Sequence, residues 1–183
     1  MSRFPINRVR IIGGVLRGRV LRFPAAPGLR PTPDRVRETL FNWLGQDLSG
    51  LACLDLYAGS GALSLEALSR GATLAVAVDE SRALADALRS TAADFHAEGL
   101  EVHCGDARAY LRREARHFGI IFLDPPFASD PWDWLLPACE ARLAPGGLIY
   151  AEAGRRLEAP PGLRRHRADR AGQVHYHLLA RAD

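Results

Sequence analysis

From residue 51 onward, short apolar runs alternate with amphipathic segments along the chain. The apolar runs predict strands over residues 51–57, 73–78, 100–104, 119–123 and 147–152. Between them, apolar positions at helical spacing predict helices over residues 62–69, 82–95, 107–117 and 131–143. Regular alternation of strands and helices is typical of a parallel sheet that is covered on both faces. The sequence therefore predicts an α/β fold.

The first 45 residues follow a different pattern. Residues 9–12 and 19–23 are strand-like runs with glycines between them, and they predict a hairpin. A connector rich in Pro and Gly over residues 24–31 leads to Thr32, which has the position of an N-cap. The helix that follows is expected to end at Gly45.

The chain also closes on a hairpin pattern, because residues 163–168 and 174–180 are strand-like and flank a polar turn. We expect two parts, a basic N-terminal hairpin and helix extension over residues 1–45 and a main domain over residues 46–183. The main domain is expected to carry the chemistry.

Composition places few further limits on function. The chain of 183 residues is 48% hydrophobic and 25% charged, and it has no apolar stretch long enough for a membrane span. Its first residues lack the apolar core of a secretory signal. Cys53, Cys104 and Cys139 form no CxxC pair, so we expect buried free thiols and a cytoplasmic location.

Charge is unevenly distributed. All 24 basic residues are arginine, and nine of them lie in residues 1–37, where the only acid is Asp34. This segment has a net charge of +8 on a mildly acidic body, which is typical of a nucleic-acid binder. A solvated terminus of biased composition is the alternative. The candidate RNA contacts are Arg10, Arg17, Arg19 and Arg35.

The most informative motif is Asp124-Pro125-Pro126-Phe127, which directly follows the apolar run 119–123. It should therefore lie at the carboxyl end of a central strand, where α/β proteins bind ligands. Asp124 can accept hydrogen bonds from an exocyclic amine, the prolines stiffen the turn, and Phe127 offers a face for stacking. The alternative is a tight turn with no chemical role.

A second motif follows the strand predicted over residues 51–57. It is an acid, Asp55, and then Gly59-Ser60-Gly61 at the start of a helix. A dinucleotide-binding fingerprint would need a third glycine where Ser64 stands, and Asp55 would repel a pyrophosphate. A carboxylate here suits a cationic ligand that bears an ammonium and a sulfonium group. A glycine-rich turn without a ligand is the alternative.

Two more acids follow the next two predicted strands. Asp79 has the position of an acid that holds a ribose diol, and Asp106 could accept a hydrogen bond from an adenine amine. Each could instead be an acid that favours a helix N-terminus. The candidate cofactor-binding residues are Asp55, Tyr57, Ala58, Gly59, Ser60, Gly61, Asp79, Glu80, Asp106 and Ala107.

With these motifs the chain resembles the Rossmann-like class I methyltransferases that use S-adenosylmethionine. More narrowly, it resembles the bacterial 16S rRNA guanine-N2 methyltransferases of the RsmD type. The resemblance covers nearly the whole chain. It rests on Arg10-Ile11-Ile12-Gly13-Gly14, Arg17-Gly18-Arg19, Gly28-Leu29-Arg30-Pro31-Thr32, residues 34–44, Leu54-Asp55, Gly59-Ser60-Gly61-Ala62-Leu63 and Ala171-Gly172-Gln173-Val174.

The resemblance implies a seven-stranded, mostly parallel sheet whose last strand is antiparallel. It also implies S-adenosylmethionine as cofactor and the N2 amine of one guanine, position 966, as target. The expected partner is 16S rRNA in the small ribosomal subunit or its assembly intermediate, without membrane, DNA or metal. Tyr57 and Asp79 depart from the family pattern, which commonly has Phe and Glu there.

Two other functions are compatible with the motifs. One is methylation of another exocyclic amine, in DNA adenine or cytosine or in a protein glutamine. The other is a non-catalytic RNA-binding assembly factor. The six histidines have no spacing that indicates a metal site.

Overall fold

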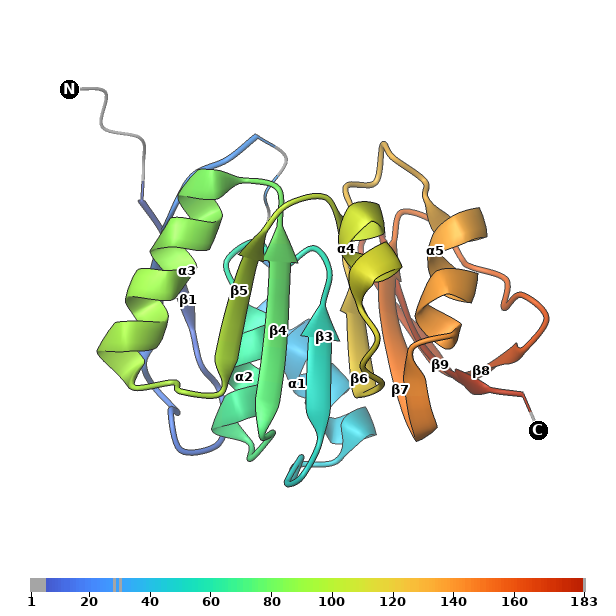
Figure 1. Ribbon diagram of the computed structural model, residues 1–183, viewed down its shortest axis with the longest axis horizontal. Helices are drawn as coiled ribbons and strands as arrows, with labels where there is room; N and C mark the ends of the chain where they lie inside the picture. The colour runs from blue at the N-terminus through green and yellow to red at the C-terminus, as the bar shows by residue number, and fades with distance from the viewer. Residues whose placement is uncertain (1–5, 28, 30, 183) are drawn as a thin grey trace.

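The computed structural model describes residues 6–27, 29 and 31–182. Its main feature is a sheet of seven strands in the order β5-β4-β3-β6-β7-β9-β8 (Figure 1). The strands are β3 (Ala52–Asp55), β4 (Leu74–Asp79), β5 (Leu100–Cys104), β6 (Phe118–Leu123), β7 (Leu143–Ala153), β8 (Leu163–Ala171) and β9 (Val174–Arg181). A separate antiparallel pair, β1 (Ile6–Arg10) and β2 (Val20–Pro24), forms the N-terminal hairpin.

Helices cover both faces of the sheet. Figure 1 shows α4 (Ala107–Arg113) and α5 (Trp132–Glu140) in front of it, with α1 (Asp34–Leu44) and α2 (Ala62–Ser69) behind. The fifth helix of the described chain, α3 (Arg82–Phe95), packs with α2 and the N-terminal hairpin in one apolar cluster. The expected fold class is confirmed.

The strand directions bring the ends of several strands to one edge of the sheet. Strands β5, β4, β3, β6 and β7 are parallel, whereas β9 is antiparallel to both β7 and β8. The chain runs outward from β3 to β5 and then returns to β6 beside β3. Such a reversal opens a crevice at the carboxyl ends of the strands on either side of it. The motifs after β3 and β6 therefore flank one crevice.

The N-terminal helix belongs to the packing of the sheet. Its buried residues Val36, Leu40 and Phe41 share a cluster with Phe122 of β6 and Tyr150 of β7. Apolar positions of α1 thus cover one face of the central strands. The division into parts at residue 45 stays a prediction.

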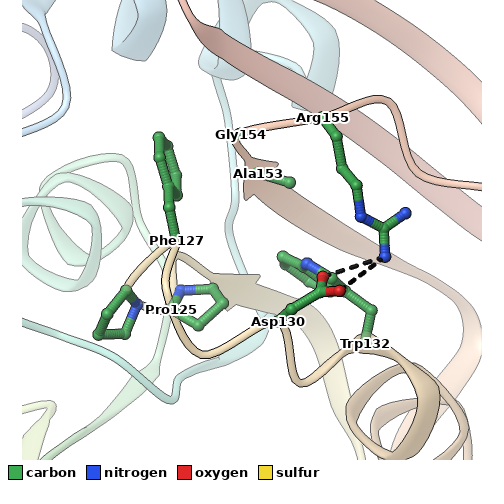
Figure 2. Close-up of a pocket in the computed structure, with 8 residues that line it drawn as sticks. Pro125, Phe127, Asp130, Trp132, Ala153, Gly154 and Arg155 are labelled. Atoms are coloured by element: carbon green, nitrogen blue, oxygen red, sulfur yellow. Dashed lines mark hydrogen bonds and ion pairs between the residues drawn. The ribbon is translucent and has the colours of Figure 1, made fainter.

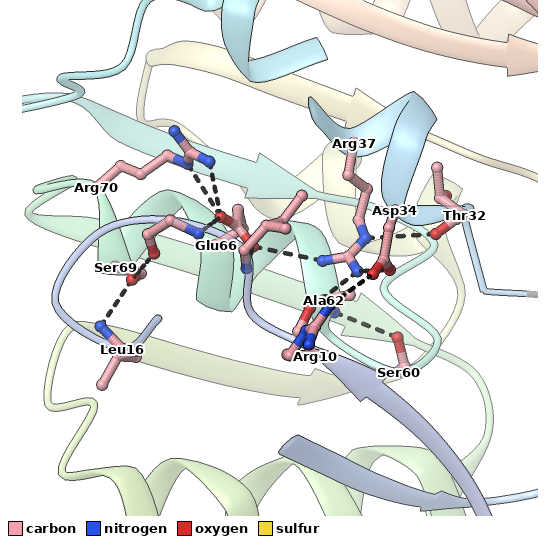
Figure 3. Close-up of polar contacts among 12 residues, drawn as sticks. Arg10, Leu16, Thr32, Asp34, Arg37, Ser60, Ala62, Glu66, Ser69 and Arg70 are labelled. Atoms are coloured by element: carbon pink, nitrogen blue, oxygen red, sulfur yellow. Dashed lines mark hydrogen bonds and ion pairs between the residues drawn. The ribbon is translucent and has the colours of Figure 1, made fainter. Parts of the chain in front are cut away.

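The hairpin is fixed to α2 by a buried carboxylate. Glu66 accepts hydrogen bonds from the backbone N–H groups of Ile12 (2.9 Å) and Gly13 (2.7 Å). Its other partners are the buried guanidinium groups of Arg37 (3.4 Å) and Arg70 (2.9 Å), as Figure 3 shows. Two cations and two backbone donors satisfy this one carboxylate, which holds the loop between β1 and β2 on α2.

Some local expectations were wrong. Thr32 does not cap α1, because its hydroxyl donates to Glu152 instead and the helix begins at Asp34 after Pro33. Helix α4 ends at Arg113, not near residue 117, because the Glu114 carboxylate accepts from the backbone N–H of Arg116 (2.9 Å). Cys53 and Cys139 are buried free thiols as expected, but Cys104 is exposed.

Among the described residues, no helix is both long enough and apolar enough to span a bilayer.

The substitution Glu66→Ala should destabilise the chain by about 3–5 kcal/mol, because it leaves the buried Arg70 without a counter-ion and Arg37 with only the half-exposed Asp34. Urea denaturation measures the change in the free energy of unfolding. Asp86→Ala removes an exposed ion pair with Arg89 and is the matched control, with an expected loss of at most about 1 kcal/mol. Equal losses in the two variants would contradict a fixing role for Glu66.

Candidate functional site

The predicted motifs meet at one edge of the sheet. Asp55 ends β3, Asp79 ends β4, and Asp124 directly follows β6. Since β4, β3 and β6 are neighbouring parallel strands, their carboxyl ends lie side by side. The structure therefore brings together the candidate residues that the sequence separates by up to 69 positions.

The glycine loop is shaped by its neighbours. Gly61 precedes α2 with a φ of 76°, and a Cβ there would lie 2.3 Å from Leu88 Cδ1. Gly59 has a φ of 53°, and its backbone N–H donates to Asp79 Oδ2 (2.8 Å). A side chain at either position would strain the turn, so the loop presents its backbone at the crevice.

Asp55 is a buried acid beneath this loop. Ser64 Oγ donates to its Oδ2 (2.8 Å), so the serine that stands at the third glycine position of a dinucleotide motif serves this acid. Burial raises the pKa of Asp55 to about 7, and the charge of Asp79 adds to the shift. Near neutral pH, the Asp55 carboxyl of the free protein is therefore partly protonated and partly ionised.

The acids after β4 and β5 differ from each other. Asp79 connects two loops, because it accepts from Gly59 and from the backbone N–H of Ser81 (2.9 Å). Asp106 is exposed and caps α4 by accepting from the backbone N–H of Ala109 (2.7 Å). The capping alternative therefore applies to Asp106. Only its Oδ1 accepts this bond, and no described residue donates to Oδ2.

The remaining loop candidates also surround the strand ends. Ala58 N–H donates to Val78 O (3.0 Å), and Ala62 N–H donates to Ser60 Oγ (3.3 Å). Burial raises the pKa of Tyr57, and the charges of Asp106 and Glu80 contribute. Tyr57 therefore lies near these acids, while Ala107 opens α4 beside them.

The Asp-Pro-Pro-Phe turn, which follows β6, contains a carboxylate that accepts no hydrogen bond from the described residues. Asp124 is partly buried, and no described residue donates a hydrogen bond to its carboxylate. Burial, Glu152 and Asp55 raise the pKa of Asp124 well above its usual range. Ser129 Oγ and N–H both donate to Pro126 O (2.7 and 2.9 Å), which closes the turn.

A pocket of about 300 Å³ adjoins this turn (Figure 2). It is lined by Pro125, Pro126, Phe127, Asp130, Trp132, Ala153, Gly154 and Arg155. The ring of Phe127 is 49% exposed and lies over Gly154, where an added Cβ would come within 3.3 Å of Phe127 Cδ2. Part of the ring thus packs on Gly154, and about half of the residue stays exposed.

Sequence reasoning missed Glu152. It lies near the end of β7, is 3% exposed, and accepts from Thr32 Oγ1 (2.8 Å) and Tyr150 OH (2.9 Å) at the same oxygen, Oε1. Leu123 pairs with Ala151, so Asp124 and Glu152 follow as neighbours on adjacent strands. The rule that picked out acids at strand ends would have found Glu152 if it had been extended to the fifth strand.

The candidate RNA contacts do not form one uniform surface. Arg17 and Arg35 are exposed. Arg10 reaches Asp34 (3.7 Å), and Arg19 donates to Asp94 O (3.2 Å) and lies over the Phe95 ring.

Other arginines of the basic segment have different roles. Arg37 is fully buried, so it cannot contact a phosphate. Arg8 and Arg22 are exposed register partners across the hairpin. Arg3 and Arg30 lie outside the described residues. Fewer arginines of this segment are therefore available to an external anion than its formal charge of +8 suggests.

Within the described ranges, no group of three His, Cys, Asp or Glu side chains is arranged to hold a metal ion.

A seven-stranded sheet in this order, with a glycine loop after its first strand and an Asp-Pro-Pro-Phe turn after its fourth, defines a class I methyltransferase fold. The family model described as "Conserved hypothetical protein 95" matches residues 9–180. The chain belongs to this family.

Named relatives agree with this assignment. The chain is 42% identical over 182 residues to "Ribosomal RNA small subunit methyltransferase D" of Escherichia coli strain K12, with 96% of this chain and 91% of the relative covered. It is also similar to a solved Escherichia coli structure described as "Putative methyltransferase yhhF", at 42% identity and a TM-score of 0.86. That match covers 96% of this chain and 98% of the other.

A more distant solved structure shares the fold. It is the Thermus thermophilus 16S rRNA N2 G1207 methyltransferase (RsmC) in complex with AdoMet and guanosine, with a TM-score of 0.72 and 24% identity. The match covers 98% of this chain and 50% of that one.

The raised pKa of Asp55 makes stability depend on pH. Between about pH 4 and 7 the folded chain keeps a proton that the unfolded chain releases, so stability falls as pH rises through that window. Asp55→Asn removes this loss. From pH 4.5 to 8, the wild type should lose about 2–4 kcal/mol of unfolding free energy relative to the variant, as measured by urea denaturation. Parallel curves would show that Asp55 is ionised throughout.

Proposed function

We propose that the chain transfers a methyl group from S-adenosylmethionine to the exocyclic N2 amine of a guanine, position 966, in 16S rRNA of the small ribosomal subunit. The observation that carries the proposal is the carboxylate of Asp124, which lies at a strand end beside the glycine loop without a donor among the described residues. The names of the relatives favour rRNA over DNA, protein glutamine or a non-catalytic role.

The residues around the crevice fit the proposed cofactor. Asp55 and the backbone of Gly59, Ser60 and Gly61 suit a group that carries an ammonium and a sulfonium charge. Asp79 suits a ribose diol, and Asp106 suits an adenine amine. The other candidate positions, Tyr57, Ala58, Glu80 and Ala107, adjoin these contacts. When bound there, the cofactor supplies an activated methyl group.

Asp124 has the chemistry to orient the target amine. The N2 lone pair of guanine is delocalised into the ring, so the amine is a weak nucleophile. Hydrogen bonds from the amine to Asp124 and to the Pro125 carbonyl would favour tetrahedral nitrogen and free the lone pair. Alignment of this kind contributes up to about 7–11 kcal/mol to lowering a barrier. The methylated amine is acidic and releases its proton to Asp124 or water.

The exposed part of Phe127 would receive the base. A base that stacks on the exposed face of Phe127 gains about 1–3 kcal/mol. A paired base could not reach Asp124, so the target must be unpaired or flipped out. The stiff prolines keep Asp124 and Phe127 in a fixed relation while the base enters.

The basic N-terminal part would dock the RNA. Residues 1–45 form the docking extension and residues 46–183 the catalytic domain in this proposal. The substrate is small-subunit rRNA within the subunit or its assembly intermediate, and the reaction takes place in the cytoplasm without a metal.

Asp124→Ala should reduce methyl transfer at least about 100-fold, because the amine loses its orienting acceptor. Single-turnover transfer of labelled methyl to small-subunit rRNA, naked or in particles, measures the rate. Calorimetry should show an S-adenosylmethionine affinity within a few-fold of the wild type. Asp133→Ala, an exposed acid of α5, is the control and should keep both properties. A wild-type rate in Asp124→Ala would mean that the turn is only structural.

Replacing Arg10, Arg17 and Arg19 with Gln should weaken RNA binding and flatten its salt dependence by about 0.7–0.9 log units per lost phosphate contact. Affinity is measured across a tenfold range of salt. The matched control replaces three arginines of α4, Arg108, Arg112 and Arg113. An unchanged slope in the N-terminal triple variant would locate the RNA elsewhere, for example at Arg155, Arg156, Arg164 and Arg165.

A further inference from the structure

Glu152 is a buried acid, and its hydrogen-bond partners differ from those of Glu66, the buried acid that fixes the hairpin. Glu66 has two guanidinium groups and two backbone donors. Glu152 receives only two neutral hydroxyls, from Thr32 and Tyr150, and both reach Oε1. Among residues 6–27, 29 and 31–182, no group donates to Oε2 or forms an ion pair with Glu152. A carboxylate offers about four acceptor sites, so half of this one is unused.

The backbone places Glu152 beside Asp124. Phe122 and Tyr150 are register partners, and both side chains lie in the cluster on the α1 face of the sheet. Because side chains alternate along a strand, Asp124 and Glu152 come next on that same face. Neighbouring strands lie about 4.8 Å apart, which is close enough for side chains on both strands to reach one base edge. Two carboxylates thus stand side by side where the target amine is expected.

We propose that Glu152 is a specificity-determining residue that accepts a hydrogen bond from the N1–H of the target guanine, next to the N2 amine held by Asp124. The inference rests on the proposed function of this same site. It assigns the α1-face carboxylate pair, not Asp124 alone, to recognition of the base.

The chemistry of the bases supports this assignment. A flipped base is recognised by hydrogen bonds to its Watson–Crick edge. In guanine the exocyclic amine has a second donor beside it, N1–H. In adenine and cytosine the exocyclic amine is next to a ring nitrogen that is an acceptor. Two adjacent carboxylates therefore match guanine and oppose a lone pair on adenine or cytosine.

The hydroxyls of Thr32 and Tyr150 define which oxygen would meet the base. Both donate to Oε1, so Oε1 faces them and Oε2 is left for N1–H. Thr32 belongs to the connector that leads into α1, just after the basic hairpin. The contact therefore joins the RNA-docking extension to the base-recognising acid.

The test uses 2-aminopurine, which keeps the N2 amine of guanine but has a lone pair at N1. Single-turnover methyl transfer is measured on small-subunit RNA, in the form that the wild type accepts, with guanine or 2-aminopurine at the target position. The wild type should prefer guanine by at least about tenfold, because a site built to accept a donor rejects an analogue that lacks it. Where turnover of the analogue is too slow, the ratio of the two RNA affinities replaces the ratio of rates.

Glu152→Gln should reduce this preference at least about tenfold. The amide oxygen of the side chain in this variant can still accept from Thr32 and Tyr150, and the amide N–H₂ group then points toward the base. There the N–H₂ group opposes the N1–H of guanine but can donate to the N1 lone pair of 2-aminopurine. Glu114→Gln alters a buried acid that contacts Arg116, away from the crevice, and should keep the wild-type preference. Calorimetry with S-adenosylmethionine and thermal unfolding verify that each variant is folded.

The possible outcomes separate the two proposals. If Glu152→Gln slows both RNAs by the same factor, or changes neither, Glu152 only holds the connector and the inference is wrong. If the wild type methylates neither guanine nor 2-aminopurine in any small-subunit RNA, the proposed function fails, and the inference fails with it. A preference that narrows in Glu152→Gln alone supports both.

Discussion

Parallel pairing of β3 with its two neighbours is the constraint on which the site depends. Each parallel strand delivers its last residue to the same edge of the sheet, so acids that are distant in sequence become neighbours. The return of the chain from β5 to β6 then opens the crevice between the glycine loop and the Asp-Pro-Pro-Phe turn. A different strand order would leave the same motifs on separate parts of the molecule.

This arrangement brings three acids close together without a cationic side chain among the described residues to pair with them. Burial raises the pKa of Asp55, Asp124 and Glu152, and each is near another of the three. The contrast is Glu66, whose carboxylate is surrounded by donors and fixes the hairpin. Acids without cationic partners in the described part of the chain suit a site that binds a cationic cofactor and the hydrogen-bond donors of a substrate.

The extension and the sheet are connected through polar contacts as well as apolar packing. Glu66 holds the hairpin loop, Arg37 connects α1 to α2, and Thr32 reaches Glu152. Each of these contacts joins the first 37 residues to the α2–β7 part of the chain. Through Thr32, the first 37 residues are therefore hydrogen-bonded to an acid near the carboxyl ends of the strands.

Local patterns determined much of this protein from sequence. Alternating apolar runs gave the strands and helices, and the glycine and proline positions located Asp55 and Asp124 at strand ends, because turn residues and periodicity act over short range. Only the tertiary structure decided the roles of Thr32, Arg37 and Glu152. Thr32 has the sequence context of a cap, Arg37 is one of nine arginines in the basic segment, and Glu152 has the context of an ordinary strand end. Their partners lie 120 residues away for Thr32 and 29 for the Arg37–Glu66 pair, so only long-range packing could settle which hydrogen bonds form.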